Sequence, residues 1–347
     1  MNLLPDTDQQ AIASAAAAFL ARETPVGRAR FDRALWSRMG ELGWFSLGLP
    51  GEVGGAGYTV VEEAVLFREL GRFLAPGPFL ATTLACRAAA AAGELGLLAD
   101  LAAGRRVAGL AEAHHDPEAT VGRAVTGRYR LLDADGADLL LVVAPDGIAV
   151  VDASGALERR AFAGLDPATD VALARLAGVA ALAVVPNAGD DPHAGGPGGA
   201  SPGDCGAVLL AALLVGICEA TRDQSVAFAS KREQFGRPIG SFQAVKHRCA
   251  DMAVRAEAAA SLTFLAALTL RDGESEAARL VPLAKALTSE YALASAGDNI
   301  QNHGGMGFTD ECTAHLYLKR ASILSTVLGS PAELWASTIR RPAPGRA

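Results

Sequence analysis

The side chains best suited to chemistry in this sequence gather at a predicted corner between two helices, within residues 230–252. They are a guanidinium, two amides and an aromatic ring: Arg232, Gln234, Gln243 and Phe235. Gly236 and Pro238 predict a tight turn, because proline lacks an amide proton and glycine tolerates positive φ. Ser241 is the expected N-cap of the second helix. This set favours an anionic, planar ligand such as a dinucleotide, and the alternative is an ordinary interhelical turn with solvated polar residues.

A second candidate site is the glycine-rich segment Gln301–Phe308, which reads Gln-Asn-His-Gly-Gly-Met-Gly-Phe. Gly304 and Gly305 have no Cβ, so backbone amides there can approach a phosphate or a ribose closely. The alternative is that Gly304 serves as the C-cap of a helix. We expect His303 to pack or to form a hydrogen bond rather than to act as a base.

Side chains of the types that bind metal ions are adjacent at His114, His115 and Asp116. Neighbouring residues on a strand point to opposite faces, and the sequence has no further ligands at a suitable spacing. We therefore expect no metal site.

Composition limits the class of protein. The chain has 347 residues, enough for two or three packed domains, and half of them are hydrophobic. The 31 basic and 38 acidic residues give a net charge of −7 with no basic block, which argues against nucleic acid and against a membrane surface as partners. The 5 cysteines are scattered and form no C-x-x-C pair, so we expect reduced thiols and a cytoplasmic location.

The spacing of apolar residues changes along the chain, and it indicates which helices and strands position these side chains. Apolar spacing is helical at both ends, and short alternating runs with Asp-Gly turns lie between. The predicted segments are a helical domain over 1–104, a small β domain over 105–186, a Gly/Pro-rich linker over 187–204 and a helical bundle over 205–347. The predicted fold class is mostly α with a small β domain. Pro282 must kink a helix of the bundle or begin a new one.

The string R-x-Q-F-G-x-P-I-x-x-x-Q-x-x-K-x-x-x-A-D-M, from Arg232 to Met252, resembles the signature of the acyl-CoA dehydrogenase family, flavoenzymes that desaturate acyl thioesters. The Gln301–Phe308 segment is similar to the family's Q-x-H-G-G-x-G-F loop. The resemblance implies the family fold: an N-terminal helical domain, a short sandwich-like or barrel-like β domain and a C-terminal four-helix bundle. It also implies an FAD whose flavin lies in the neighbouring subunit and whose ADP part contacts Arg232, Gln234, Phe235, Gln243, Gln301, Gly304 and Gly305.

The family's catalytic base is missing from both of its usual positions. Desaturation needs a base for the α-proton while the flavin accepts hydride from the β-carbon, and the family uses a Glu. Alignment without gaps places Leu328 at that Glu, and Gly206 at the alternative position used by some members. A positioned base contributes roughly 10²- to 10⁴-fold to the rate. The family's T-E-P and W-I-T motifs around the flavin are also absent, with Gly109–Asp116 in the place of the first.

The retained and missing parts suggest a short branch of the family that pairs with a full-length homologue in α2β2 assemblies, known from steroid side-chain degradation. The expected function is that of one subunit of an FAD-dependent acyl-CoA dehydrogenase. This subunit would supply the residues that contact the ADP part of FAD, which we call the ADP-side half-site, and a partner subunit would carry the catalytic Glu. One alternative is a self-assembling flavoenzyme, such as a homotetramer, with a displaced base, for which the candidates are Asp204, Glu219, Asp310 and Glu311. Another is a flavin-free scaffold or acyl-binding protein. The sequence does not identify the acyl chain.

Overall fold

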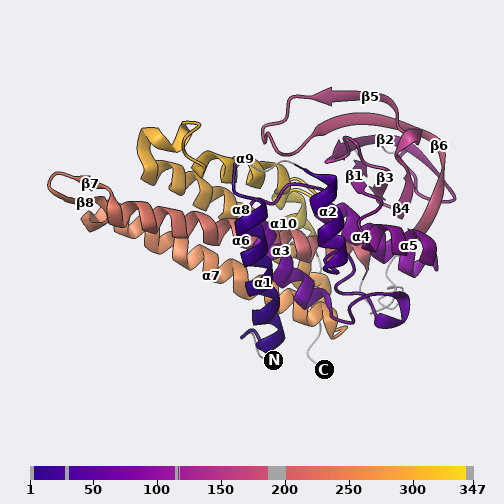
Figure 1. Cartoon of the computed structure of the whole chain (residues 1–347), viewed down its shortest axis with the longest axis horizontal. Coiled ribbons are helices and arrows are strands. Elements are labelled where there is room, and N and C mark those ends of the chain that lie inside the picture. Colours follow the sequence, from indigo (N-terminus) through magenta and orange to yellow (C-terminus); the bar gives the residue numbers. More distant parts are fainter. Residues whose placement is uncertain (1–3, 28–30, 114–115, 117, 187–200, 341–347) are drawn as a thin grey trace.

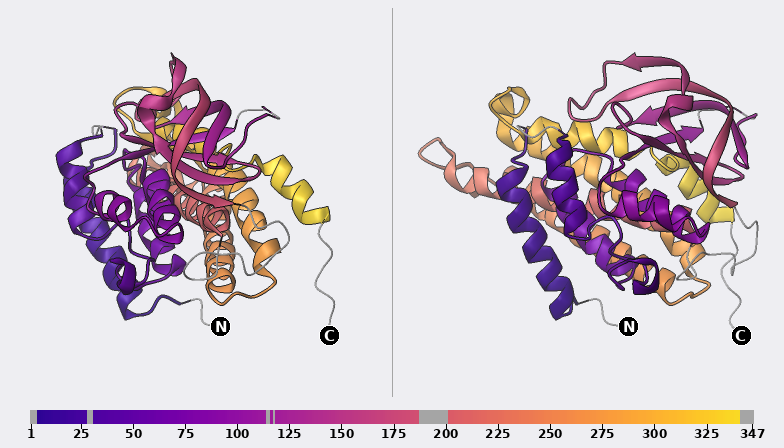
Figure 2. Two further views of the ribbon diagram at one scale, coloured as in Figure 1. Left: turned by 90° about the vertical axis from the view of Figure 1, so that its right-hand side faces the viewer. Right: turned by 45° about the vertical axis from the view of Figure 1, so that its right-hand side comes forward.

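The computed structural model describes residues 4–27, 31–113, 116, 118–186 and 201–340. Helices form both ends of this part of the chain, and a curved sheet lies over one end of them (Figures 1 and 2). The fold is mostly helical with a small barrel-like β domain, as predicted. The N-terminal helices are α1 (Thr7–Glu23), α2 (Arg33–Glu41), the 3-10 turn η1 (Gly51–Val53), α3 (Val60–Arg72), α4 (Phe79–Ala91) and α5 (Leu95–Ala102).

The β domain is one six-stranded sheet in the order β2-β1-β3-β4-β6-β5. Its strands are β1 (Ala108–Ala113), β2 (Ala124–Leu132), β3 (Leu139–Ala144), β4 (Gly147–Asp152), β5 (Leu157–Phe162) and β6 (Val171–Pro186), with the 3-10 turn η2 (Ala153–Gly155). Strands β1 and β3 are parallel, and the other pairs are antiparallel. The long strand β6 also pairs with β2, which closes the sheet on itself and leaves β2 with a partner on each side.

The C-terminal bundle contains α6 (Pro202–Lys231), α7 (Gln243–Arg271), α8 (Ala277–His303), α9 (Ala314–Leu324) and α10 (Pro331–Arg340). Helix α6 begins three residues before the predicted bundle boundary at Cys205, because Ser201 caps it and Pro202 suits a first helical turn. Pro282 lies inside α8, so it does not begin a new helix. Residues 187–200 of the predicted linker lie outside the described residues.

Helices α3 and α6 cross closely and join the two helical regions. A Cβ on Gly71 would lie 2.0 Å from the carbonyl oxygen of Leu213, and a Cβ on Gly216 would lie 2.0 Å from that of Arg68. Only glycine allows this approach. The Arg68 guanidinium then binds both carboxylate oxygens of Glu219 at 2.8 Å, a bidentate pair across the same crossing.

Two bundle helices, α6 and α7, have the length and apolar composition that could cross a membrane, a property also found in core helices. Within the protein, 83% of the apolar window of α6 is buried, so α6 serves as the central core helix. The corresponding value for α7 is 44%. Helix α7 therefore leaves much of an apolar face uncovered by this chain.

Candidate functional site

The predicted corner is a short hairpin at the far end of α6. Its strands are β7 (Glu233–Gln234) and β8 (Arg237–Pro238), and Phe235 and Gly236 form the turn with φ of 55° and 77°. A left-handed backbone is strained for a bulky residue such as phenylalanine. The ring of Phe235 is nevertheless 91% exposed. Strain combined with an uncovered aromatic ring indicates a turn that is kept for contact with a ligand or partner.

The prediction that Ser241 caps α7 is wrong. Ser241 ends the 3-10 turn η3 (Ile239–Ser241), and Phe242 occupies the N-cap position without a side-chain cap. The Ser241 hydroxyl is buried and has no hydrogen-bond partner in the described part of the chain. Ser241 does not cap α7 because the turn packs closely on α6. A Cβ on Gly240 would lie 3.0 Å from the carbonyl oxygen of Ala229. Gln243, the first residue of α7, is exposed beside uncapped helix amides.

The glycine-rich segment lies at the same end of the bundle as the hairpin, at the end of α8 and in the 3-10 turn η4 (Gly304–Phe308) (Figure 1). The His303 ring stacks on Phe228 of α6 at 4.3 Å, and its Nδ1 lies 2.8 Å from the carbonyl oxygen of Asn299, which confirms a packing role. Gly304 is the C-cap of α8, with φ of 62°. A Cβ added at Gly304 or Gly305 would have no neighbour within 4 Å among the residues that the structure describes, so the backbone there faces open space.

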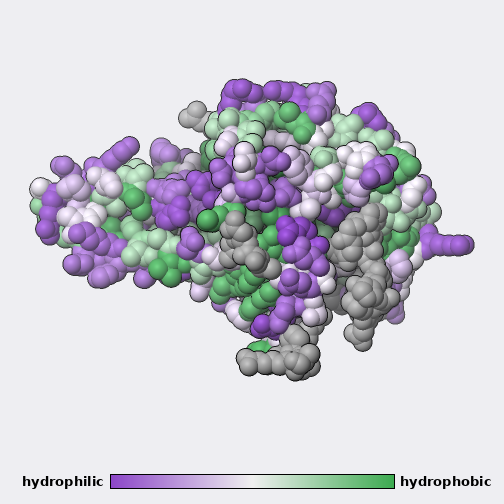
Figure 3. Space-filling view, turned by 90° about the horizontal axis from the view of Figure 1, so that it is seen from below, coloured by the Kyte–Doolittle hydropathy of each residue, from purple (hydrophilic) through white to green (hydrophobic). Residues whose placement is uncertain are grey.

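The remaining predicted cofactor residues are exposed around this end of the molecule. The set comprises Arg232, Gln234, Gln243 and Gln301. The Arg232 amide donates to the carbonyl oxygen of Phe228 and ends α6, and Gln234 donates through its side chain to the carbonyl oxygen of Glu233. The surface of this protruding end is largely hydrophilic (Figure 3). Its polar groups are open to solvent rather than enclosed.

The structure brings the two predicted base positions together. A Cβ on Gly206 would lie 2.8 Å from Cδ1 of Leu328 and 2.9 Å from Cδ1 of Leu84. Both positions therefore border the same spot between α6 and the segment after α9. An aliphatic side chain and a glycine cannot accept a proton, so this spot lacks the group that would remove one.

Residues 325–329, which we call the base-position loop, are tied to the sheet by two side chains that the sequence analysis missed. Glu112 of β1 accepts a hydrogen bond from the Leu328 amide at 2.7 Å and forms an ion pair with Arg130 of β2. Arg130 in turn donates to the hydroxyl of Thr326 at 2.9 Å and to its carbonyl oxygen at 3.1 Å. The Glu112 carboxylate, which contacts the predicted base position Leu328, is thus engaged in holding the loop.

A buried lysine supports the same loop from the bundle. Lys285 of α8 is 0% exposed, and its Nζ donates to the carbonyl oxygens of Ser325 at 2.7 Å and Gly329 at 3.1 Å. Burial lowers the pKa of Lys285 to about 7, and the nearby Glu112 opposes that shift. A lysine among apolar residues on the core face of a predicted helix was the available sequence signal.

The carboxylates considered as displaced bases have other roles or lie on the surface. Glu219 is buried and is bound by Arg68 and by Arg72, the latter at 3.0 Å. Asp204 accepts a hydrogen bond from the Ser201 hydroxyl at 2.8 Å in the first turn of α6. The last two candidates are exposed after η4: Asp310 and Glu311.

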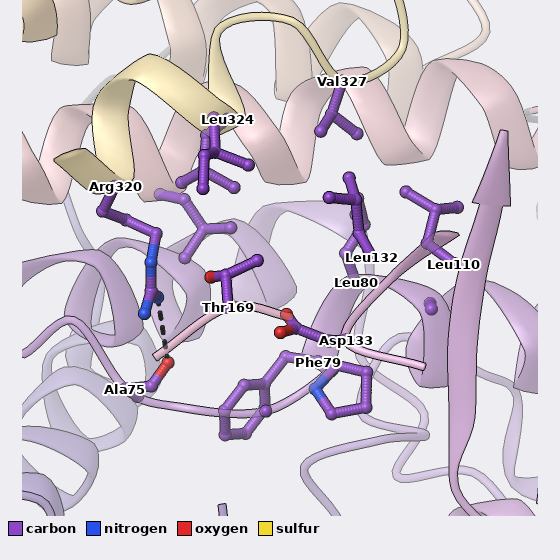
Figure 4. A pocket seen from close by; sticks show the side chains of 15 residues that line it. Ala75, Phe79, Leu80, Leu110, Leu132, Asp133, Thr169, Arg320, Leu324 and Val327 are labelled. Atoms are coloured by element: carbon purple, nitrogen blue, oxygen red, sulfur yellow. Dashed lines mark hydrogen bonds between the residues drawn. The ribbon is translucent and has the colours of Figure 1, made fainter. Parts of the chain in front are cut away.

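A cavity of about 60 Å³ lies between the start of α4, the sheet and α9, and we call it the α4–α9 cavity (Figure 4). Its wall is mostly aliphatic and includes Leu80, Leu110 and Val327, the last a residue of the base-position loop. The polar side chains in the wall are Asp133, Thr169 and Arg320. This wall suits an apolar group.

His114 and His115 lie outside the described residues, so the absence of a metal site there stays a prediction. Asp116 accepts hydrogen bonds from the amides of Glu118 at 3.0 Å and Arg128 at 2.8 Å. These bonds lower the pKa of Asp116 and give it a local structural role in the turn between β1 and β2.

Comparison with known proteins identifies relatives along most of the chain. Residues 6–97 match the model of the acyl-CoA dehydrogenase N-terminal domain, and residues 204–341 match that of the C-terminal domain. Acyl-CoA dehydrogenase IpdE2 of Mycobacterium tuberculosis is 34% identical over 96% of this chain and 94% of its own length. Acyl-CoA dehydrogenase FadE34 of the same organism is 35% identical over 87% of this chain, but the match covers only 41% of FadE34.

Solved structures have the same fold. The ChsE4-ChsE5 complex from Mycobacterium tuberculosis gives a TM-score of 0.84 at 23% identity, covering 99% of this chain and 100% of the matched chain. The Tcur3481-Tcur3483 steroid ACAD variant gives a TM-score of 0.80 at 25% identity, with coverage of 95% and 96%. The predicted family and fold are confirmed. This chain belongs to the acyl-CoA dehydrogenase family, oxidoreductases that act on the CH–CH group of acyl-CoA thioesters.

Proposed function

We propose that this chain is one subunit of a heteromeric FAD-dependent acyl-CoA dehydrogenase, in which a homologous partner carries the catalytic Glu. The observation that carries the proposal is the contact of Leu328 with Gly206: the two positions where the family places its base meet in space, and neither has a proton acceptor. The carboxylate that contacts Leu328, that of Glu112, accepts a hydrogen bond from the Leu328 amide and pairs with Arg130. Proton removal then falls to the partner.

The exposed end of the bundle has the chemistry that the ADP part of FAD requires. The Arg232 guanidinium would neutralise the diphosphate, and the open backbone at Gly304 and Gly305 would let it approach the amides. The exposed ring of Phe235 would cover an aromatic or apolar surface. Bound FAD supplies the hydride acceptor of the reaction. These groups point away from their own chain, which supports a half-site that serves a neighbouring subunit.

Three comparisons support the heteromeric assembly. ChsE4-ChsE5 and Tcur3481-Tcur3483 are each named as pairs of chains, and both have this fold. The segment that resembles this chain covers only 41% of FadE34, so that polypeptide has room for a second unit of similar size. The word steroid in the description of Tcur3481-Tcur3483 favours an acyl-CoA substrate from lipid or steroid metabolism. We place the assembly in the cytoplasm.

Co-purification tests the proposal. The chain should be expressed alone and together with an acyl-CoA dehydrogenase homologue that retains the T-E-P loop and the Glu. We expect a colourless product alone and a yellow, active complex with the partner, with activity abolished when the partner's Glu becomes Gln. A yellow and active homotetramer of this chain alone would contradict the proposal. The displaced-base alternative is tested separately by replacing each of its candidates with the matching amide in the active complex, and unchanged turnover in all four variants would remove it: Asp204→Asn, Glu219→Gln, Asp310→Asn and Glu311→Gln.

A further inference from the structure

The hairpin at the far end of α6 presents a second arginine, Arg237, that the sequence analysis did not single out (Figure 1). Gln234 of β7 and Arg237 of β8 are direct partners across the two strands, and such partners lie on one face of a hairpin. Arg232 continues the ladder, because its carbonyl oxygen accepts a hydrogen bond from the Ile239 amide at 2.7 Å. Its backbone is extended, with φ of −73° and ψ of 123°, and it precedes Gln234 by two positions. Side chains two positions apart on a strand share a face, so one face of the hairpin carries both guanidinium groups and the amide.

The charges of these two guanidinium groups are not neutralised within the part of the chain that the structure describes. Arg232 and Arg237 are exposed and form no ion pair there. By contrast, Arg222 of α6 pairs with Asp223 at 2.8 Å. Two like charges on one face of a hairpin repel each other unless an anion lies against both. The arrangement therefore favours a ligand with more than one negative charge.

An aromatic ring fixes the direction of Arg237. The Cζ atom of Arg237 lies 4.2 Å from the centroid of the ring of Phe242, the N-cap residue of α7. The same ring meets that of Phe235 edge-on, with centroids 6.1 Å apart. The face of an aromatic ring attracts a guanidinium, and stacking uses none of its five N–H donors. Phe242 thus orients Arg237 and leaves its donors free for a ligand.

On the basis of the function proposed above, we propose that Arg237 is a second cation for the diphosphate of FAD in the ADP-side half-site, and that Phe242 is its positioning residue. The diphosphate carries one negative charge on each phosphoryl group at neutral pH. Arginine binds phosphate oxygens through paired N–H donors, and two guanidinium groups on one face match the two charges.

FAD titration of the complex with the partner, after its flavin has been removed, tests this assignment through flavin fluorescence. We expect Arg237→Ala to weaken FAD binding about tenfold, because a charged hydrogen bond is lost. Arg237→Gln, which keeps a similar length without the charge, should reproduce the loss. Added salt should weaken FAD binding less in both variants than in the native complex, since one exposed charge contact is missing. The charge-matched control, Arg271→Ala at the other end of α7, should bind FAD as the native complex does.

Variants of Phe242 separate a positioning role from a purely structural one. Phe242→Leu removes the ring face and should weaken FAD binding about two- to fivefold, the factor expected for one exposed cation–π contact. In the Arg237→Ala background the same change should have little further effect, because both changes remove one contact. Phe242→Tyr keeps the ring face and should retain the native affinity. Equal losses from Phe242→Leu in both backgrounds would overturn the positioning role.

Arg232→Ala, measured alongside, distinguishes the failure of this assignment from the failure of the half-site. If Arg232→Ala weakens FAD binding and the two Arg237 variants do not, the half-site stands and Arg237 has no part in it. If no variant weakens FAD binding, or the native complex binds no FAD, both the half-site and the role of Arg237 are wrong.

Discussion

At the scale of single residues, Arg232 provides the direct test of the half-site. One guanidinium on a diphosphate is worth about 1.5–3 kcal/mol, or roughly 10- to 100-fold in affinity. We expect Arg232→Ala to lower the FAD content of the purified complex, measured from flavin absorbance per protein, and FAD in excess to restore it. The matched control is Arg271→Ala at the opposite end of α7, where Arg271 pairs with the neighbouring Asp272. Unchanged FAD content in Arg232→Ala would show that the cofactor lies elsewhere.

Asp133 gives a residue-scale prediction about stability. Its pKa is raised to about 7, so between about pH 4 and pH 7 the native state binds more protons than the unfolded state. The native protein therefore loses stability as pH rises through this range. Asp133→Asn has no such titration, and urea unfolding should find it more stable than the native chain at pH 8, by on the order of 1–3 kcal/mol, but not at pH 4.5. A constant difference between the two chains would refute the assignment of the buried acid.

At the scale of elements, the contact between α6 and the base-position loop predicts opposite effects for two glycines of one helix. Gly206→Ala would press its Cβ against the side-chain ends of Leu328 and Leu84, which must change rotamer, so we expect a loss of about 0.5–1.5 kcal/mol in the free energy of unfolding. Among the described residues, a Cβ on Gly203 would meet only the Ser201 hydroxyl at 3.8 Å, and Gly203→Ala should be neutral or stabilise by up to about 1 kcal/mol. Urea midpoints compare the two, and equal effects would contradict the close packing.

The support of the base-position loop by α8 makes a second prediction at this scale. Burial lowers the pKa of Lys285 to about 7, so from about pH 7 to pH 10 the unfolded state binds more protons than the native state. The native chain should gain stability relative to Lys285→Met as pH rises, by at most about 1.4 kcal/mol per pH unit. Urea unfolding at pH 7 and pH 9.5 measures this difference. A difference that does not change with pH would mean that the lysine stays charged in its site.

At the scale of the whole molecule, the uncovered apolar groups at the far end of the bundle favour assembly with another subunit. Phe235 is 91% exposed and Phe308 is 72% exposed. We expect the double variant Phe235→Ala, Phe308→Ala to weaken co-purification with the partner on size exclusion, while its own stability stays within about 0.5 kcal/mol. The control, Leu95→Ala, removes an apolar side chain that is 54% exposed on α5, away from this end. Intact assembly of the double variant would place the interface elsewhere.

The sequence alone predicted the family and the order of helical and β regions, and both predictions are confirmed. It also singled out two segments as candidates for cofactor binding, which stays a prediction. Each segment is continuous, from Arg232 to Met252 and from Gln301 to Phe308, and turn chemistry acts over a few neighbouring residues. The failure at Ser241 occurred where packing of the turn against α6 overrode a local capping preference.

Only the tertiary structure decided what lies around the former base positions. It brought Gly206 against Leu328, attached Glu112 to the Leu328 amide and enclosed Asp133 in an aliphatic wall. These outcomes join segments that are distant along the chain. They depend on how helices and sheet pack and on how much water each charge loses, and neither quantity can be read from the spacing of residues within one element.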